Sequence, residues 1–302
     1  MSDTIIHQHQ PPRGQLLKWI GNKQRSAAEI ASVFPDEYGR YFEPFLGAGA
    51  VMATVAPHDG LGSDTYGPLI EIWDALANTP EELVRWYAER WYYFMSGDKT
   101  SRYTAIRERF NSSPNGADLL FLCRSCYGGV VRFRKADGHM STPIGAHNPI
   151  SPESFRTRVE EWHVRMKGCR FAHADYTEAF ALAEPGDLIY CDPPYAHSQS
   201  ILYGAQGFSL DALLREIMTA KNRGVLVVLS IDGHKQSGRH LLELTLPDGL
   251  FETQLLVDKG PSMLRRFQLN GTSSHGEGVA DRLLLTYPVA RASELLVNLA
   301  RG

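Results

Sequence analysis

The chain has 302 residues, of which 43% are hydrophobic and 22% charged, with a formal net charge of −3. This composition is typical of a globular protein of one large or two modest domains, and it excludes a globally basic surface. A nucleic-acid partner would therefore have to be recognised from local charge. No apolar run reaches transmembrane length, Met1–Pro12 lacks the core of a signal peptide, and the four cysteines are too few for a disulfide framework. We expect no membrane partner and a cytoplasmic protein.

The first predicted elements follow a polar tail, Met1–Arg13. A short apolar stretch, Leu16–Lys23, closes on Gly-Asn-Lys and alone indicates no more than the start of a strand or helix with a turn. Ser26–Phe34 has apolar residues at helical spacing. Arg40–Leu46 then predicts a strand, which a glycine turn connects to an apolar helix that continues to about Val55.

Two glycines and an acid in this region suit a nucleotide-like ligand. Gly47 and Gly49 follow the strand and precede the helix, where glycine permits positive φ and close approach of the backbone to a ligand. Tight-turn packing explains such a pair equally well. Asp64 ends a second predicted strand, Leu61–Asp64, and there it either accepts hydrogen bonds from ribose hydroxyls or caps the helix after Pro68. Together the three residues fit an adenosine-bearing cofactor.

The middle of the chain is first helical and then basic. Tyr66–Phe121 has helical periodicity, with aromatic residues that we assign to the core. Cys123–Arg170 has a formal charge of +5, so this segment either faces phosphates or is a solvated basic surface. Val130–His139 within it predicts a basic hairpin or loop that can reach a DNA groove. A zinc site at Cys123 and Cys126 is not expected, because no second cysteine pair stands at ligand spacing.

The return to the sheet brings a further acid to a strand end. Phe171–Tyr176 places Asp175 where it either accepts a hydrogen bond from an adenine amino group or caps the helix Glu178–Leu182. The later predicted elements are a loop over the site (His197–Ser209), a helix (Asp211–Lys221), a buried strand (Gly224–Ser230), a polar loop (Leu269–Gly278) and a late strand (Asp281–Tyr287).

The stretch that carries the chemistry is a buried strand, Leu188–Cys191, followed by Asp192–Tyr195, which reads Asp-Pro-Pro-Tyr. The prolines stiffen the backbone where the chain leaves the sheet, and so hold the Asp192 carboxylate, the Pro193 carbonyl and the Tyr195 ring in one geometry. Two acceptors beside an aromatic ring can hold the exocyclic amino group of a planar base that stacks on the ring. Acceptors on both N–H bonds localise the nitrogen lone pair as a methyl group approaches, so Asp192 acts by preorganised electrostatics. Alone, the tetrapeptide is equally well explained as an ordinary turn after a strand.

Four pieces occur in order along the chain: Lys18–Lys23, Phe42–Gly49, Asp64 and Asp192–Tyr195. Together they resemble the Dam-like, D12-class (alpha group) DNA adenine-N6 methyltransferases over nearly the whole chain. The resemblance implies an α/β fold, with a Rossmann-like sheet that binds S-adenosylmethionine (SAM) and an inserted, mostly helical DNA-recognition domain.

The resemblance also implies roles for individual residues. Those expected to bind SAM are Trp19, Lys23, Phe45, Gly47, Gly49, Asp64, Asp175, Tyr176 and Asp192. The expected catalytic tetrapeptide, which receives a flipped-out adenine, consists of Asp192, Pro193, Pro194 and Tyr195. The expected DNA-binding residues are Arg124, Arg132, Arg134, Lys135 and His139, and no metal is expected.

On this basis the catalytic domain comprises residues 1–65 and 170–302, and the target-recognition domain comprises residues 66–169. We expect double-stranded DNA as substrate, a monomer or weak dimer, a restriction endonuclease of the same specificity as a candidate partner, and a bacterial or phage-infected cell. The sequence departs from the family pattern at Ile20–Asn22, where many members have Ala-Gly-Gly, and at Cys123–Cys126, where an Asn-Arg pair is common. The second departure leaves the recognised DNA sequence open.

Three alternatives stay open on the sequence. The same chemistry suits cytosine N4, an RNA base or the amide of a protein glutamine, although Asp rather than Ser or Asn at position 192 favours adenine. A catalytically silent DNA-binding protein on the same scaffold is the second alternative. A nicotinamide-dependent dehydrogenase is the third, but the turn at Gly47 has no third glycine.

Overall fold

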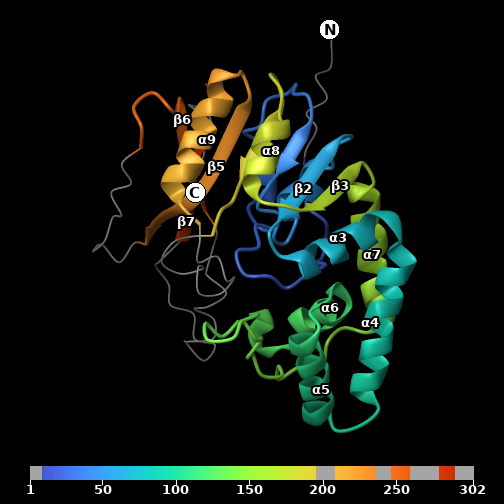
Figure 1. Ribbon diagram of the computed structural model, residues 1–302. Helices are drawn as coiled ribbons and strands as arrows, with labels where there is room; N and C mark the ends of the chain where they lie inside the picture. Colours follow the sequence, from blue (N-terminus) through green and yellow to red (C-terminus); the bar gives the residue numbers. More distant parts are fainter. Residues whose placement is uncertain (1–8, 195–207, 236–245, 259–278, 290–302) are drawn as a thin grey trace.

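A seven-stranded sheet forms the upper part of the computed structural model, which describes residues 9–194, 208–235, 246–258 and 279–289 (Figure 1). Its strands are β1 (Tyr41–Glu43), β2 (Gly60–Asp64), β3 (Cys169–His173), β4 (Leu188–Cys191), β5 (Leu226–Lys235), β6 (Thr253–Asp258) and β7 (Val279–Leu285). They lie in the order β3-β2-β1-β4-β5-β7-β6. The neighbouring pairs from β3 to β5 are parallel, whereas β7 runs antiparallel to both β5 and β6.

Helices cover both faces of the sheet, and this explains why the central strands are apolar without alternation. Every residue of β1 and of β4 is buried. Figure 1 shows α8 (Tyr176–Leu182) and α9 (Leu210–Asn222) against one face. The other face packs against α1 (Ala27–Ala31), α2 (Ala50–Val55), α3 (Gly67–Asn78) and α7 (Pro152–Met166). Tyr190 and Leu188 of β4 contact this second group, and Ile189 between them contacts the first.

The strand order reverses between β1 and β4, which are neighbours in the sheet although some 140 residues separate them. The loops that follow these two strands leave in opposite directions from the carboxyl edge of the sheet. In open α/β sheets such a position is where ligands bind. The sequence places its glycine turn after β1 and its Asp-Pro-Pro segment after β4, so both lie at this edge.

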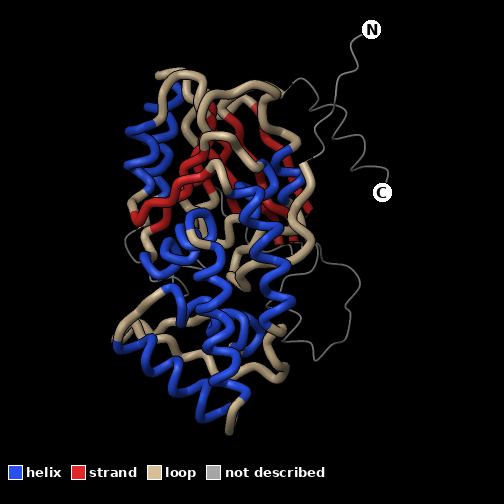
Figure 2. The backbone as a smooth tube through the Cα atoms, turned by 90° about the vertical axis from the view of Figure 1, so that its right-hand side faces the viewer, coloured by secondary structure: helices blue, strands red, loops and turns tan. Residues whose placement is uncertain are grey.

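A helical part lies below the sheet and consists of α4 (Pro80–Met95), α5 (Lys99–Ser112), α6 (Gly116–Ser125) and the short 3-10 helix η1 (Tyr127–Gly129) (Figure 2). All residues of α6 are buried, because α3, α4 and α5 surround it. The rings of Tyr87 and Phe94 on α4 pack against Phe121 on α6. One hydrophobic core continues from these helices to the helices that cover the sheet. None of the described helices is long and apolar enough to span a membrane.

The α/β class predicted from the sequence is confirmed, and the differences are local. The predicted helix Ser26–Phe34 is shorter, because the backbone leaves the helix after Ala31. We did not predict α7 and β6. The loops predicted at 197–209 and 269–278 lie almost entirely outside the described residues. The domain boundaries at residues 65 and 170 stay a prediction, since α3 and α7 contact the sheet layer as well as the helical part.

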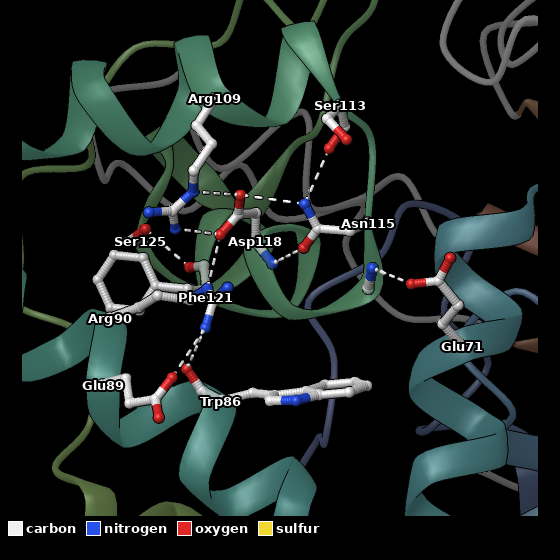
Figure 3. A network of polar contacts seen from close by, with 11 residues as sticks. Glu71, Trp86, Glu89, Arg90, Arg109, Ser113, Asn115, Asp118, Phe121 and Ser125 are labelled. Carbon is white, nitrogen blue, oxygen red and sulfur yellow. Dashed lines mark hydrogen bonds and ion pairs between the residues drawn. The ribbon is translucent and has the colours of Figure 1, made fainter.

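A buried carboxylate joins the three helices of the helical part (Figure 3). Asp118 on α6 is fully buried, and its Oδ1 accepts a hydrogen bond from Arg90 Nε of α4 at 2.6 Å. Arg109 of α5 donates to both carboxylate oxygens, with Nε 2.8 Å from Oδ2. Asn115, the N-cap of α6, accepts from the Asp118 amide and donates back to its side chain. Burial alone would raise the pKa of Asp118, but these donors outweigh it and lower the pKa.

We predict that Asp118→Ala lowers the free energy of unfolding by about 3 kcal/mol, because it removes a fully buried carboxylate and leaves the part-buried Arg90 with the more distant, exposed Glu89 as its counter-ion, at 3.7 Å. Arg109→Ala should cost less, about 1 kcal/mol, since its side chain is 54% exposed. Urea denaturation at pH 7 followed by circular dichroism measures both. Glu81→Ala, which removes an exposed ion pair with Arg156, serves as the matched control and should change little. Equal stability of Asp118→Ala and the wild type would contradict this account.

Candidate active site

A cavity of about 390 Å³ lies at the carboxyl ends of β1, β2 and β4. All nine residues predicted to bind SAM line it: Trp19, Lys23, Phe45, Gly47, Gly49, Asp64, Asp175, Tyr176 and Asp192. They come from the N-terminal segment and from the carboxyl ends of four different strands, including the loops that follow them and the first residue of α8. Residues that are spread over more than 170 positions of the sequence are therefore brought together in one cavity by the fold.

The loop after β1 is shaped by two glycines in the left-handed region, Gly47 at φ +48° and Gly49 at φ +60°. A Cβ at Gly49 would lie 3.1 Å from Trp73 and Met166, so packing against the core requires glycine there. The Gly47 carbonyl accepts a hydrogen bond from Trp73 Nε1 at 3.0 Å. A Cβ at Gly47 would lie 3.5 Å from Trp19, in ordinary contact, although the positive φ still favours glycine. Both glycines line the cavity, and tight packing is a second constraint that applies to Gly49 alone of the two.

Asp64 holds the loop after β1 in place. Its Oδ2 accepts from the Gly47 amide at 3.1 Å and its Oδ1 accepts from the Tyr66 amide at 3.0 Å. It does not cap α3, whose N-cap residue is Tyr66 and has no side-chain cap. Burial raises the pKa of Asp64, although the two hydrogen bonds act in the opposite direction. Each carboxylate oxygen has a second lone pair, so the side chain can still accept from a ligand hydroxyl.

Asp175 caps α8 and also lines the cavity, so the helix cap considered for it is present and its contact with an adenine amino group stays a prediction. Its Oδ1 accepts from the Thr177 amide at 3.0 Å, so Asp175 is the N-cap of α8, and it also lines the cavity. The next residue, Tyr176, stacks on Phe45 with ring centroids 5.3 Å apart and an angle of 25° between the planes. This pair presents apolar surface to a planar ligand.

Asp192 follows β4 and is 15% exposed. Its Oδ1 lies 2.6 Å from the ammonium of Lys23, which is 5% exposed and also lies 3.6 Å from the buried Asp281 of β7. Pro194 lines the cavity, and Pro193 is buried behind it. Tyr195 lies outside the described residues. The tetrapeptide therefore brings one carboxylate, already oriented by a cation, to the inner end of the cavity.

Sequence reasoning missed Glu43 as a site residue. Glu43 ends β1, lines the cavity and accepts from the Tyr41 hydroxyl at 2.8 Å. Burial, with a contribution from the nearby Asp192, raises the pKa of Glu43 to about 8, so its carboxyl group is mostly protonated at neutral pH. The signal was present in the sequence, because Glu43 ends a strand in the same way as Asp64. A proline, Pro44, follows Glu43 directly, as Pro193 follows Asp192.

The placement of Arg124 corrects its predicted role. Arg124 is 6% exposed, and its Nη1 donates to the carbonyls of Gln15 and Leu16 at 2.9 and 2.8 Å. Arg158 and Trp162 of α7 donate to carbonyls of the same segment. Arg124 therefore holds the segment that leads to Trp19 and is not accessible for a DNA contact in this structure. Its position at the end of α6, which is wholly buried, is the reason.

The other predicted DNA-binding residues lie on the basic loop, Val130–Thr142. An isolated bridge pairs Phe133 with Met140, and two backbone hydrogen bonds between Arg132 and Ser141 and between Arg134 and His139 fold the loop back on itself. Of the four predicted residues, Arg132, Arg134 and Lys135 are exposed and His139 is half-buried. Arg134 pairs with Asp137 at 2.6 Å and lies 3.2 Å from the His139 ring. The four residues predicted on this loop are thus accessible from solvent, at least in part.

The two cysteines near this loop are packed in the core. Burial raises the pKa of the Cys123 thiol to about 11 and that of Cys126 to about 12, so both are thiols at neutral pH. In the described part of the chain, no group of three or more His, Cys, Asp or Glu side chains is arranged to hold a metal ion.

Comparison with known proteins decides the family. The model of the D12 class N6 adenine-specific DNA methyltransferases matches residues 19–244, about three quarters of the chain. The chain belongs to this family. The matched residues begin at Trp19 and include both the glycine turn and the Asp-Pro-Pro segment that line the cavity.

Several named relatives resemble this D12-class methyltransferase. A DNA adenine methylase of Vibrio cholerae is 32% identical over 227 residues, which cover 71% of this chain and 79% of that protein. The retron Ec67 DNA adenine methylase of Escherichia coli is 30% identical over 203 residues, 65% of this chain and 68% of the relative. A type II methyltransferase of Lactococcus lactis, M1.LlaDCHI, is 25% identical over 256 residues, 77% and 88% respectively.

The raised pKa of Glu43 predicts how the stability of this methyltransferase depends on pH. In the unfolded chain the carboxyl group ionises near its usual pKa of 4.5, whereas in the folded protein it ionises near 8. The folded state therefore binds the proton more tightly, and Glu43 lowers stability as the pH rises from about 5 to about 8, by about 1.4 kcal/mol per pH unit.

Glu43→Gln keeps the shape and an acceptor for Tyr41 but does not titrate. We expect the wild type to lose stability relative to Glu43→Gln between pH 5 and pH 8, with no further change above that range. Urea denaturation of both proteins at one-unit intervals from pH 5 to pH 9 measures this. A difference that is independent of pH would show that Glu43 ionises in the folded protein as it does in the unfolded chain.

Proposed function

We propose that this protein transfers a methyl group from SAM to N6 of an adenine in double-stranded DNA, at a defined sequence, with the base rotated out of the duplex. The observation that carries the proposal is that the eight other residues expected to bind the cofactor line the same cavity as Asp192. Donor and acceptor sites that share one cavity allow direct transfer between two bound groups, as proximity catalysis requires.

The residues of the cavity fit SAM chemically. Asp64 and Asp175 supply acceptors for ribose hydroxyls and for an adenine amino group, and Phe45 with Tyr176 supplies a flat apolar surface. Gly47, which has no side chain, keeps the backbone close to the ligand. SAM, when bound, supplies a methyl group on a positively charged sulfur, which neighbouring carboxylates stabilise.

Asp192 is the group that we expect to contact the target amine. Its carboxylate can accept one N6–H, and the proposed role of the Pro193 carbonyl is to accept the other. Lys23 fixes the orientation of Asp192 before the base arrives, since its ammonium lies 2.6 Å from Oδ1. Because the carboxylate is only 15% exposed, few water molecules have to be removed from it. The expected stacking of the base on Tyr195 stays a sequence prediction.

The basic loop is the proposed DNA-facing surface. Arg132, Arg134 and Lys135 are exposed there, and phosphate contacts of such residues give affinity that falls with salt. Rotation of the adenine out of the duplex costs a few kcal/mol, which contacts to the flipped base and to the backbone offset. A partner endonuclease and the oligomeric state stay predictions. The relatives include a type II methyltransferase and a retron methylase, and these names support either kind of genetic context.

Methylation of unmodified double-stranded DNA with labelled SAM, followed by nucleoside analysis and modification-aware sequencing, tests the proposal. We expect N6-methyladenine at one recurrent short sequence. Label in cytosine, in RNA or in protein would contradict adenine as the substrate and would still support methyl transfer from SAM. SAM binding without any transfer would favour the catalytically silent DNA-binding protein.

We predict that Asp192→Ala lowers kcat for DNA methylation at least about 100-fold, because it removes an acceptor that acts mainly in the transition state. The dissociation constant for SAM should change far less, since most of the proposed cofactor contacts remain. Steady-state kinetics and calorimetry measure the two quantities. Asp211→Asn, an exposed acid at the start of α9, is the control. Activity of Asp192→Ala within a few-fold of the wild type would exclude the assigned role.

For the basic loop, the double variant Arg132→Ala/Arg134→Ala should bind duplex DNA at least about tenfold more weakly and show a smaller salt dependence. Its affinity for SAM without DNA should be unchanged by the loss of these two charges. Fluorescence anisotropy over a range of salt concentrations measures the DNA affinity. Arg85→Ala on α4, an exposed arginine outside the basic loop, is the matched control. Identical salt dependence in the double variant and the wild type would place the DNA elsewhere.

A further inference from the structure

Phe133 on the basic loop lies between two exposed arginines but is itself turned toward the cavity. Arg132 and Arg134 are exposed, whereas Phe133 between them is partly buried and lines the cavity that contains Asp64 and Asp192. The loop, drawn in green beside α6 in Figure 1, thus contributes a wall to the proposed cofactor site. Alternate side chains of one short segment therefore face solvent and the cavity, as in an extended strand.

Phe133 reaches the cofactor residues through Tyr66. The two rings meet edge to face, with centroids 5.5 Å apart and an angle of 64° between the planes. The Tyr66 ring also stacks on Trp19 at 6.1 Å, and its backbone amide donates to Asp64 Oδ1 at 3.0 Å. Tyr66 is thus in direct contact with the loop and with two residues predicted to hold SAM. A displacement of Phe133 therefore changes the packing of Tyr66, the residue whose amide is bound to Asp64.

The opposite side of the basic loop is fixed to α5. Asn111 exchanges two hydrogen bonds with the backbone of Met140, at 2.7 and 3.1 Å, and the Tyr103 hydroxyl donates to the Thr142 carbonyl at 2.9 Å. Met140 also pairs with Phe133 across the loop. The loop is therefore held between α5 and the cavity wall. A contact that shifts its exposed arginines also shifts Phe133 relative to Tyr66.

We propose that Phe133, through its contact with Tyr66, couples DNA binding on the basic loop to cofactor binding in the cavity. The proposal rests on the function proposed above, and it adds a positioning residue to it. Phosphate contacts at Arg132 and Arg134 stabilise the arrangement in which Phe133 packs on Tyr66. A cofactor in the cavity stabilises the same wall from the other side. Because both ligands favour one arrangement, each raises the affinity for the other by the same factor.

The coupling is measured with S-adenosylhomocysteine, the product that lacks the methyl group, so that no turnover occurs. Equilibrium dialysis gives its dissociation constant without DNA and with saturating unmethylated duplex DNA. For the wild type we expect DNA to tighten binding about fivefold or more. In Phe133→Leu, which keeps apolar bulk but loses the ring, the two constants should agree within about a factor of 1.5.

Matched variants separate coupling from a general loss of structure. Tyr176→Leu removes a ring that lines the cavity from α8, so it should weaken binding and leave the factor between the two constants unchanged. Phe133→Tyr, which retains a ring, should show the same ratio of the two constants as the wild type. Tyr66→Leu keeps the amide that donates to Asp64, and it should remove the factor as Phe133→Leu does. If the two rings act as one unit, the double variant Phe133→Leu/Tyr66→Leu loses no more coupling than either single variant.

The outcomes separate this inference from the proposed function. If the wild type binds DNA and methylates adenine but shows no coupling, or if Phe133→Leu keeps the full factor, the inference is wrong and the function stands. An equal loss of the factor in Tyr176→Leu would also overturn it, because any damage to the cavity would then suffice. If the wild type neither binds nor methylates DNA, the proposed function itself fails.

Discussion

The burial of one ammonium group constrains the whole carboxyl edge of the sheet. A buried lysine costs several kcal/mol unless opposite charges compensate it, and Lys23 has Asp192 at 2.6 Å and Asp281 at 3.6 Å. These three residues come from the N-terminal segment, from the loop after β4 and from β7. Their contact therefore fixes three distant parts of the chain at one point. The segment that delivers Lys23 has to cross the edge of the sheet, and Arg124 and Trp162 hold its carbonyls on the way.

Three acids of the cavity have different partners. Glu43 has the hydroxyl of Tyr41 as a partner, and its burial keeps it mostly protonated at neutral pH. Asp192 has a full positive charge beside it. Asp64 accepts from two backbone amides. A neutral carboxyl group next to Asp192 limits the negative charge that the cavity gathers, so the acids can lie close together without strong mutual repulsion.

The sequence predicts those site residues whose position follows from local structure. Gly47 and Asp192 follow strands and Asp64 ends one, and parallel strands bring their carboxyl ends to one edge, so the cavity could be predicted. Arg124 was misassigned because charge in a sequence does not reveal that the helix carrying it is buried on all sides. The contact of Tyr66 with Phe133 could not be predicted, since it depends on how the basic loop folds back over the sheet.

The point of insertion explains why the recognition region and the cofactor cavity share a wall. The segment that contains the helical part begins directly after β2, whose last residue, Asp64, is itself part of the cavity. The chain returns to β3 along α7, which packs against α2 and α3 and so keeps the insert close to the sheet. An insert that starts at the carboxyl edge places its loops over that edge, where both β1 and β4 end. The rings of Phe133 and Tyr66 therefore connect the proposed DNA contacts on the basic loop with the proposed cofactor contact at Asp64.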